Sequence, residues 1–235
     1  YFLFLAFIIL MDKEIISVYL MPGMAAKPSI FDRIKLPEDQ FEIFYLEWMI
    51  PEENERLENY AKRMNEKIIH KNPVLLGVSF GGVLVQEMSK HIKVRKLIVV
   101  SSIKSKYELP KRMKIAKLMK AYKFAPTQLL SNLDVLKKYA FNAAISKRID
   151  LYKTYLAVND KRYLDWALKE LLLWDQKEPI ADAIYIHGDK DAIFTHSCQN
   201  GTIIVKGGTH IMVVTKYQWF NKNLPKLILG TKLKP

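Results

Sequence analysis

Short apolar runs alternate with longer helical patterns along most of this chain, and that alternation constrains the fold more than any other feature. Six apolar runs indicate buried strands, at residues 15–20, 41–46, 74–78, 96–100, 183–187 and 202–205. Helical spacing marks the segments 52–70, 81–90 and 215–229. Strands that alternate with helices are typical of βαβ units. The sequence therefore predicts an α/β fold, with a mostly parallel central sheet of about six strands and helices on both faces.

The segment between the fourth and fifth predicted strands has no strand pattern of its own. It holds several helical stretches rich in Leu, Tyr, Lys and Ala, interrupted at Pro110 and Pro126. At 235 residues, one domain with an elaboration is more consistent with the chain than two equal domains. We therefore predict a core made of residues 11–103 and 180–235, a helical cap at 104–179, and an apolar N-terminal extension at 1–10.

The N-terminal run, YFLFLAFIILM, is wholly apolar. It is shorter than the ~20 residues that span a bilayer as a helix. It also lacks the basic leader and small-residue cleavage site of a signal peptide. Two alternatives stay open: residues 1–10 are an end outside the native fold, or they are native and associate with a membrane. The single cysteine, Cys198, has no metal-ligand spacing around it and indicates a reducing, cytoplasmic location.

Positive charge is concentrated in one part of the chain. The net charge is +13, and residues 90–123 hold twelve lysines and arginines with a single glutamate. Within the predicted cap, residues 111–124 alternate lysines with Met113, Ile115 and Leu118, so one side of a helix can pack while a basic side stays in water. A solvated basic face is the commoner explanation. The partner we predict is an anionic membrane or carrier, contacted transiently through residues 104–123; no nucleic acid is expected, because no reading motif is present.

A G-x-S-x-G pattern lies between the third predicted strand and the helix that follows it, with Ser79 at its centre. The flanking Gly77 and Gly81 suit a sharp, strained turn that leaves the serine hydroxyl clear of the chain. The next backbone N–H, that of Phe80, is at a helix N-terminus, where it can stabilise a developing oxyanion. This context predicts a nucleophilic serine.

Two further motifs follow the last two predicted strands. The segment His187-Gly188-Asp189-Lys190-Asp191 comes after one strand and Gly207-Gly208-Thr209-His210 after the next. Because the carboxyl ends of parallel strands meet at one edge of a sheet, these loops should approach Ser79 there. A weakly nucleophilic serine needs a base and an orienting acid, and the sequence offers both in the order Ser, Asp, His. His187 ends a strand beside a glycine and is interpreted as a structural histidine.

Together the three motifs resemble the signatures of the α/β-hydrolase superfamily, in particular serine hydrolases with a helical cap. The resemblance covers nearly the whole chain from residue 15 onward and implies a compact variant without the two leading strands. It implies Ser79 as nucleophile, His210 as base and Asp191 as the acid, three residues past the glycine. Asp189 is then a turn residue, although it stays open as the alternative acid.

The resemblance also implies an oxyanion hole made by two backbone N–H groups, those of Phe80 and Met24. A His-Gly pair is usual in the loop after the first strand, whereas this chain has Pro22-Gly23-Met24. The missing histidine leaves the conformation of that loop unexplained. Gly23 and Trp48 are predicted to bind substrate, Trp48 either as a wall of the site mouth or as a packing residue.

The function predicted from these residues is hydrolysis of a carboxylic ester or thioester on a small acyl substrate, through an acyl-enzyme. No cofactor and no metal is expected. The alternative is a non-catalytic binding protein on a hydrolase fold that docks an anionic partner through its basic cap. Serine-dependent turnover separates the two.

Overall fold

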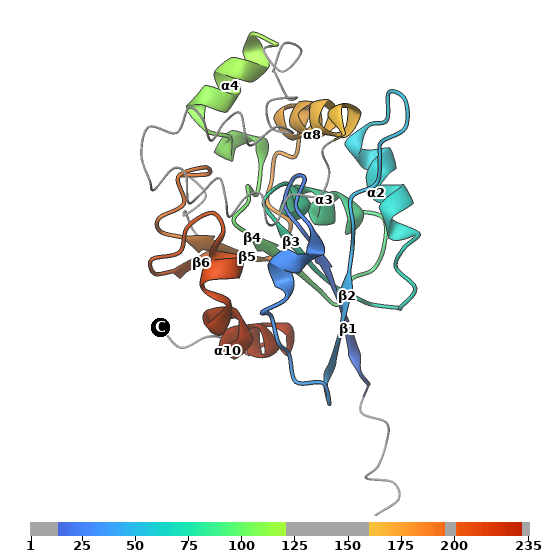
Figure 1. The fold of residues 1–235 in the computed structure, drawn as a ribbon, viewed down its shortest axis with the longest axis vertical. Helices are drawn as coiled ribbons and strands as arrows, with labels where there is room; N and C mark the ends of the chain where they lie inside the picture. The colour runs from blue at the N-terminus through green and yellow to red at the C-terminus, as the bar shows by residue number, and fades with distance from the viewer. Residues whose placement is uncertain (1–13, 121–159, 196–200, 232–235) are drawn as a thin grey trace, which may run out of the picture.

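The computed structural model describes residues 14–120, 160–195 and 201–231, and its centre is a six-stranded sheet (Figure 1). All five strand pairings are parallel, and the strand order is β2-β1-β3-β4-β5-β6. The strands are β1 (Ile16–Met21), β2 (Phe41–Tyr45), β3 (Val74–Val78), β4 (Lys96–Val100), β5 (Ile184–Gly188) and β6 (Thr202–Val205). The predicted fold class is confirmed, and each predicted strand lies within one or two residues of its observed bounds.

Helices cover both faces of this sheet, as the sequence predicted (Figure 1). One face carries α2, α3 and α8, and the other carries η1, α9 and α10. The helices are η1 (Pro28–Phe31), α2 (Leu57–Asn65), α3 (Phe80–Met88), η2 (Lys106–Glu108), α4 (Lys111–Leu118), α8 (Lys161–Leu173), α9 (Met212–Thr215) and α10 (Tyr217–Ile228).

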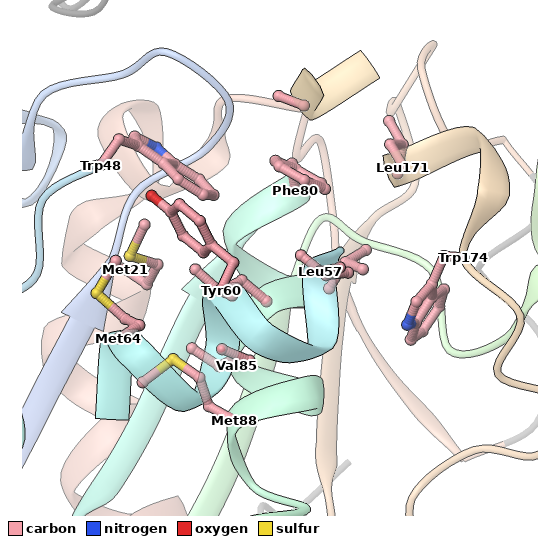
Figure 2. Packing of buried hydrophobic residues seen from close by; sticks show 14 of the residues in the cluster. Met21, Trp48, Leu57, Tyr60, Met64, Phe80, Val85, Met88, Leu171 and Trp174 are labelled. Atoms are coloured by element: carbon pink, nitrogen blue, oxygen red, sulfur yellow. The ribbon is translucent and has the colours of Figure 1, made fainter. Parts of the chain in front are cut away.

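Two hydrophobic clusters lie on the two faces of the sheet, and the central strands contribute to both. In β3, Leu75 packs among α2, α3 and α8, whereas Leu76 packs on the side of α9 and α10. Successive side chains of a strand point to opposite faces, so a strand covered on both faces needs a continuous apolar run. This requirement explains why the central strands lack the alternation of a half-exposed strand. Figure 2 shows the first cluster, where Trp48, Tyr60 and Phe80 pack together.

Two predicted helices differ from the observed ones. The helix predicted at 52–70 is the shorter α2, because the Glu55 carboxylate accepts the Glu52 N–H at 2.8 Å and folds the preceding residues into a turn. The α2 N-terminus instead meets Glu170 of α8, whose Oε2 accepts the Leu57 N–H at 3.0 Å. The helix predicted at 215–229 is α10, which begins at Tyr217 because the backbone leaves the helical conformation at Lys216, and the short α9 precedes it.

The described part of the predicted cap consists of η2, α4 and α8. Residues 121–159 lie outside the described residues, as do residues 1–10 and Cys198, so the predicted domain boundaries stay a prediction. The expectation that one side of the 111–124 helix packs is wrong for α4, where no residue is buried. Only Met113 packs partly against the core, and Ile115 and Leu118 are 57% and 83% exposed.

No helix within residues 14–120, 160–195 and 201–231 is long and apolar enough to cross a membrane. The β1 and β3 strands are neighbours, and the chain leaves them in opposite directions along the sheet, toward β2 and toward β4. Such a point, beyond the carboxyl ends of the strands, is where open α/β sheets bind ligands. The loops that leave β1 and β3 here contain Gly23 and Ser79.

Candidate active site

Ser79 lies between β3 and α3 with a φ of 54° and a ψ of −121°, in a region that L-residues rarely occupy. The turn is so tight that both flanking glycines are needed. A Cβ added at Gly77 would lie 2.2 Å from the Gly81 carbonyl oxygen, and one added at Gly81 would lie 2.2 Å from that of Pro22. The G-x-S-x-G pattern therefore describes a steric requirement.

Hydrogen bonds from neighbouring elements hold this strained residue in place. The Ser79 N–H donates to the Val100 carbonyl at 2.9 Å, at the end of β4. Its carbonyl accepts from the Gly82 N–H at 2.9 Å and from the Ser102 hydroxyl at 2.7 Å. The Ser79 side chain is half-buried, so its hydroxyl can be reached. Strain of this kind persists only where the surroundings fix it, as they do here.

The loops after β5 and β6 contact each other through a second pair of glycines. A Cβ added at Gly188 would lie 2.2 Å from the Gly208 carbonyl oxygen. That oxygen also accepts the Lys190 N–H at 2.8 Å, which fastens one loop to the other. The contact brings the Asp191 loop and the His210 loop together at the carboxyl edge of the sheet.

Three side chains, one from the turn after β3 and one from each of these two loops, form a continuous hydrogen-bonded chain. His210 Nε2 lies 2.9 Å from Ser79 Oγ, and His210 Nδ1 lies 2.9 Å from Asp191 Oδ2. With Nδ1–H donating to the carboxylate, Nε2 is free to accept the serine proton. The Phe194 ring meets the imidazole edge-on, with ring centroids 5.5 Å apart. The His210 side chain is 17% exposed and that of Asp191 only 1%, so the chain runs from the interior to the surface.

The Asp191 carboxylate is held in its ionised form by donors on both oxygens. Oδ1 accepts the N–H groups of Ile193 and Phe194, at 2.7 and 3.1 Å. Burial raises the pKa of Asp191, but its contacts with His187 and His210 and the Ile193 N–H outweigh burial, so the pKa is lowered well below its ordinary value. An ionised Asp191 is what an orienting acid requires.

The other candidates in these loops have different surroundings. Asp189, the alternative acid, is exposed and accepts the Gly207 N–H at 2.7 Å, as expected of a turn residue. His187 is buried, and its Nε2 lies 3.2 Å from Asp191 Oδ2, the oxygen that also contacts His210. Sequence reasoning missed this contact, although a histidine four residues before the acid was a usable signal.

The loop after β1 supplies the surroundings of the predicted oxyanion hole. Gly23 passes so close to Ser79 that a Cβ added at Gly23 would lie 3.4 Å from the serine Cβ. Among the described residues, the N–H groups of Met24 and Phe80 have no hydrogen-bond acceptor. Both are therefore free to bind a negatively charged oxygen, as the prediction requires.

Trp48 lies behind this loop. It is 8% exposed, stacks on Phe80 and donates its indole N–H to the Gly23 carbonyl at 2.7 Å. The packing alternative is therefore the one that this geometry favours, and contact of Gly23 or Trp48 with substrate stays a prediction. Sequence reasoning missed Tyr163, whose hydroxyl accepts the Ala25 N–H across 138 positions. No local signal could have found that contact.

Within the described ranges, no group of three or more His, Cys, Asp or Glu side chains could hold a metal ion. His196, like Cys198, lies outside those ranges. The described site brings together a serine, a histidine, a carboxylate and backbone donors, the set that nucleophilic acyl transfer uses.

Comparison with known proteins shows similarity of structure and not of sequence. No family model and no curated protein matches the chain. A thermophilic esterase from Thermogutta terrifontis superposes with a TM-score of 0.63 at 12% identity, covering 92% of this chain and 90% of the other. The enol-lactonase from Burkholderia xenovorans gives 0.63 at 12%, covering 92% of each. An N-acyl homoserine lactonase complexed with N-butanoyl homoserine gives 0.61 at 13%, covering 95% and 93%.

Proposed function

Because this chain has the α/β-hydrolase fold across nearly its whole length, we propose that it is a serine hydrolase of carboxylic esters or thioesters. The single observation that carries the proposal is the hydrogen-bonded chain from Ser79 through His210 to Asp191, with both links at 2.9 Å. Fold similarity alone supports a mechanism poorly, since one scaffold hosts many reactions. The geometry of these side chains supports acyl transfer.

In the proposed mechanism the Ser79 oxygen attacks the substrate carbonyl carbon while His210 Nε2 takes the hydroxyl proton. The carbonyl oxygen becomes an oxyanion, which the N–H groups of Phe80 and Met24 bind. Ionised Asp191 holds the imidazole and stabilises it when it is protonated. His210 then gives the proton to the leaving alcohol or thiol, and an acyl-enzyme remains. A water molecule, deprotonated by His210, attacks the acyl-enzyme and releases the acid and free Ser79.

Covalent labelling with a fluorophosphonate tests this proposal, with intact mass as the readout. The full chain should gain one adduct, Ser79→Ala should gain none, and circular dichroism should show both folded. Ser89→Ala is the matched control, because Ser89 ends α3 and its hydroxyl bonds only the Gln86 carbonyl among the described residues. It should label like the unchanged protein. An unlabelled native chain, or a labelled Ser79→Ala variant, would contradict the proposal.

A second candidate function is docking on an anionic lipid surface through α4. Ile115, Leu118 and Met119 are 57%, 83% and 70% exposed there, among the charges of Lys111, Arg112, Lys114, Lys117 and Lys120. Exposed apolar side chains surrounded by lysines suit the boundary between headgroups and acyl chains of an anionic bilayer. Turnover is not needed for this function, so it also covers the case of a binding protein on a hydrolase fold.

Vesicle co-sedimentation of Ser79→Ala tests the second candidate without interference from catalysis. The protein should bind vesicles rich in phosphatidylserine and not neutral phosphatidylcholine, and added salt should release it. A Lys117→Glu, Leu118→Ser pair should weaken binding. Lys93→Glu, which removes an exposed lysine just before β4, is the charge control. Equal weakening by both variants would indicate a general charge effect and exclude an α4 docking surface.

A further inference from the structure

The peptide bond between Gly23 and Met24 has its orientation fixed by a tryptophan from another part of the chain. The indole N–H of Trp48 donates to the Gly23 carbonyl at 2.7 Å. No cis peptide bond occurs in the described chain, and in a trans peptide the C=O and the following N–H point in opposite directions. Since Trp48 holds the carbonyl, the Met24 N–H must point away from Trp48. That N–H has no acceptor among the described residues.

The position of Trp48 is itself fixed by packing. Its ring is nearly parallel to that of Phe80, with centroids 5.2 Å apart and an interplanar angle of 9° (Figure 2). It also contacts the rings of Tyr60 and Tyr163, at centroid distances of 6.2 and 5.4 Å. Phe80 carries the other free N–H of the site and directly follows Ser79. The Trp48 side chain therefore contacts both the Gly23–Met24 peptide and the ring of Phe80, and these carry the two N–H groups that lack an acceptor among the described residues.

The next residue of the loop is strained and is held by a second buried side chain. Ala25 has a φ of 60°, in the left-handed region that a residue with a Cβ seldom adopts. Its N–H donates to the Tyr163 hydroxyl at 3.1 Å, and burial raises the pKa of Tyr163 well above its ordinary value, so the hydroxyl stays neutral. The Ala26 N–H closes the turn on the Gly23 carbonyl at 3.0 Å.

We infer that Trp48 and Tyr163 are positioning residues of the oxyanion hole, which fix the Gly23–Met24 peptide so that the Met24 N–H faces the carbonyl attacked by Ser79. The inference rests on the proposed function. It also accounts for the missing histidine, because Pro22 stands where a His-Gly pair is usual and has no side-chain donor. The loop after β1 lacks the local histidine that would support its conformation. Trp48, which follows β2, and Tyr163, which lies in α8, support it instead.

Trp48→Phe tests the inference, because phenylalanine retains the ring packing and loses the indole N–H. Losing an oxyanion donor outright lowers kcat by about 10²- to 10³-fold, so a donor that is only misdirected should lower it ~10- to 100-fold. With p-nitrophenyl butyrate as substrate, KM should stay within about twofold, since the interaction is made only in the transition state. Tyr163→Phe should act in the same way with a smaller loss of kcat.

A trifluoromethyl ketone gives a readout that a general packing defect would not reproduce. It adds to the serine as a hemiketal oxyanion, so its affinity should fall in Trp48→Phe by the same factor as kcat/KM. The matching secondary alcohol forms no oxyanion and should bind equally well to both proteins. Trp174→Phe is the matched control, because Trp174 is 5% exposed and donates its indole N–H to Glu87 at 2.6 Å, away from the loop. It should leave kcat unchanged.

The outcomes separate a failure of the inference about Trp48 and Tyr163 from a failure of the proposed hydrolase function. An active native chain with an unchanged kcat in Trp48→Phe overturns the inference and leaves the proposed function standing. An equal loss of kcat in Trp48→Phe and Trp174→Phe has the same meaning. So has a loss of kcat in Trp48→Phe that leaves the affinity for the trifluoromethyl ketone unchanged. A native chain that neither labels nor hydrolyses overturns the proposed function and the inference together. If Trp48→Phe does not fold, Tyr163→Phe decides in the same assays, and an unchanged kcat there overturns the inference.

Discussion

The loops after β5 and β6 reach the site by local means, whereas the loop after β1 reaches it through distant side chains. Asp191 and His210 follow their strands within a few residues, and the Gly188 and Gly208 backbones pack directly on each other. The Gly23 loop depends on Trp48, 25 positions away, and on Tyr163, which hydrogen-bonds Ala25 across 138 positions. The first arrangement leaves a short motif in the sequence, and the second leaves none.

This contrast between the loops indicates which parts of the candidate active site tolerate a change of sequence. A proton-transfer chain needs particular side chains at fixed offsets from strand ends, so its residues recur together. An oxyanion hole needs only backbone N–H groups, and any side chains that hold the peptide plane can serve. The proton-transfer chain and the oxyanion hole can therefore diverge at different rates. Substitutions in the two parts of the site should also have different effects on activity and stability.

Asp191→Asn should give the largest effect. The amide would leave His210 in the wrong tautomer, and in serine triads that change lowers kcat by ~10⁴-fold while geometry is kept. Asp189→Asn is the matched control two positions away, and we expect it to retain most of the activity, because among the described residues that carboxylate accepts only the Gly207 N–H. Steady-state kinetics on a small ester measures both. A larger loss in Asp189→Asn would reverse the assignment of the acid.

Gly188→Ala should give the next largest effect, and mainly on folding. Its Cβ would lie 2.2 Å from the Gly208 carbonyl oxygen, so the two loops would have to separate. We expect a loss of about 3 kcal/mol or more in the free energy of unfolding. Gly23→Ala, whose nearest contact would be 3.4 Å, should cost under about 1 kcal/mol. Urea unfolding measures both variants, and equal losses would contradict the contrast between the loops.

The sequence was sufficient to predict the strands, the elbow and the meeting of the Asp191 and His210 loops, because periodicity and motif spacing are local properties. Ser79, Asp191 and His210 lie together because parallel strands end at one edge. The role of Trp48 could not be predicted, since a residue just after a strand can face either the site or the core. Tyr163 could not be placed at all, because its partner is set by how α8 packs on the sheet.

Glu170→Gln should give a moderate effect that separates helix docking from the Tyr163 hydroxyl. The buried Glu170 carboxylate joins α8 to α2 by accepting from the Leu57 N–H and from Arg56 Nε, at 3.0 and 3.2 Å. Glutamine keeps an oxygen acceptor for the Leu57 N–H and loses only the charge, so thermal or urea unfolding should reveal a loss of about 1 kcal/mol, the difference between a charged and a neutral hydrogen bond. We expect kcat at 25 °C to change less than in Tyr163→Phe. A larger fall would mean that the whole helix, and not one hydroxyl, holds the Ala25 loop.

The last prediction concerns acid stability and not activity. The pKa of Asp191 is lower in the folded chain than in the unfolded chain, because its contacts with His187, His210 and the Ile193 N–H outweigh burial. The stabilisation from its ionised form is therefore fully present above the unfolded value of about 3.9, and it is lost as the pH falls through the lower folded value. The difference in unfolding free energy between the native chain and Asp191→Asn should shrink as the pH drops below about 4. Urea titrations from pH 7 to about 2 measure it, with Asp189→Asn as the control for losing one carboxylate. If the difference in unfolding free energy stayed constant over that range, Asp191 would gain no stabilisation from its ionised form. The N–H donors around its carboxylate would then serve only to orient His210.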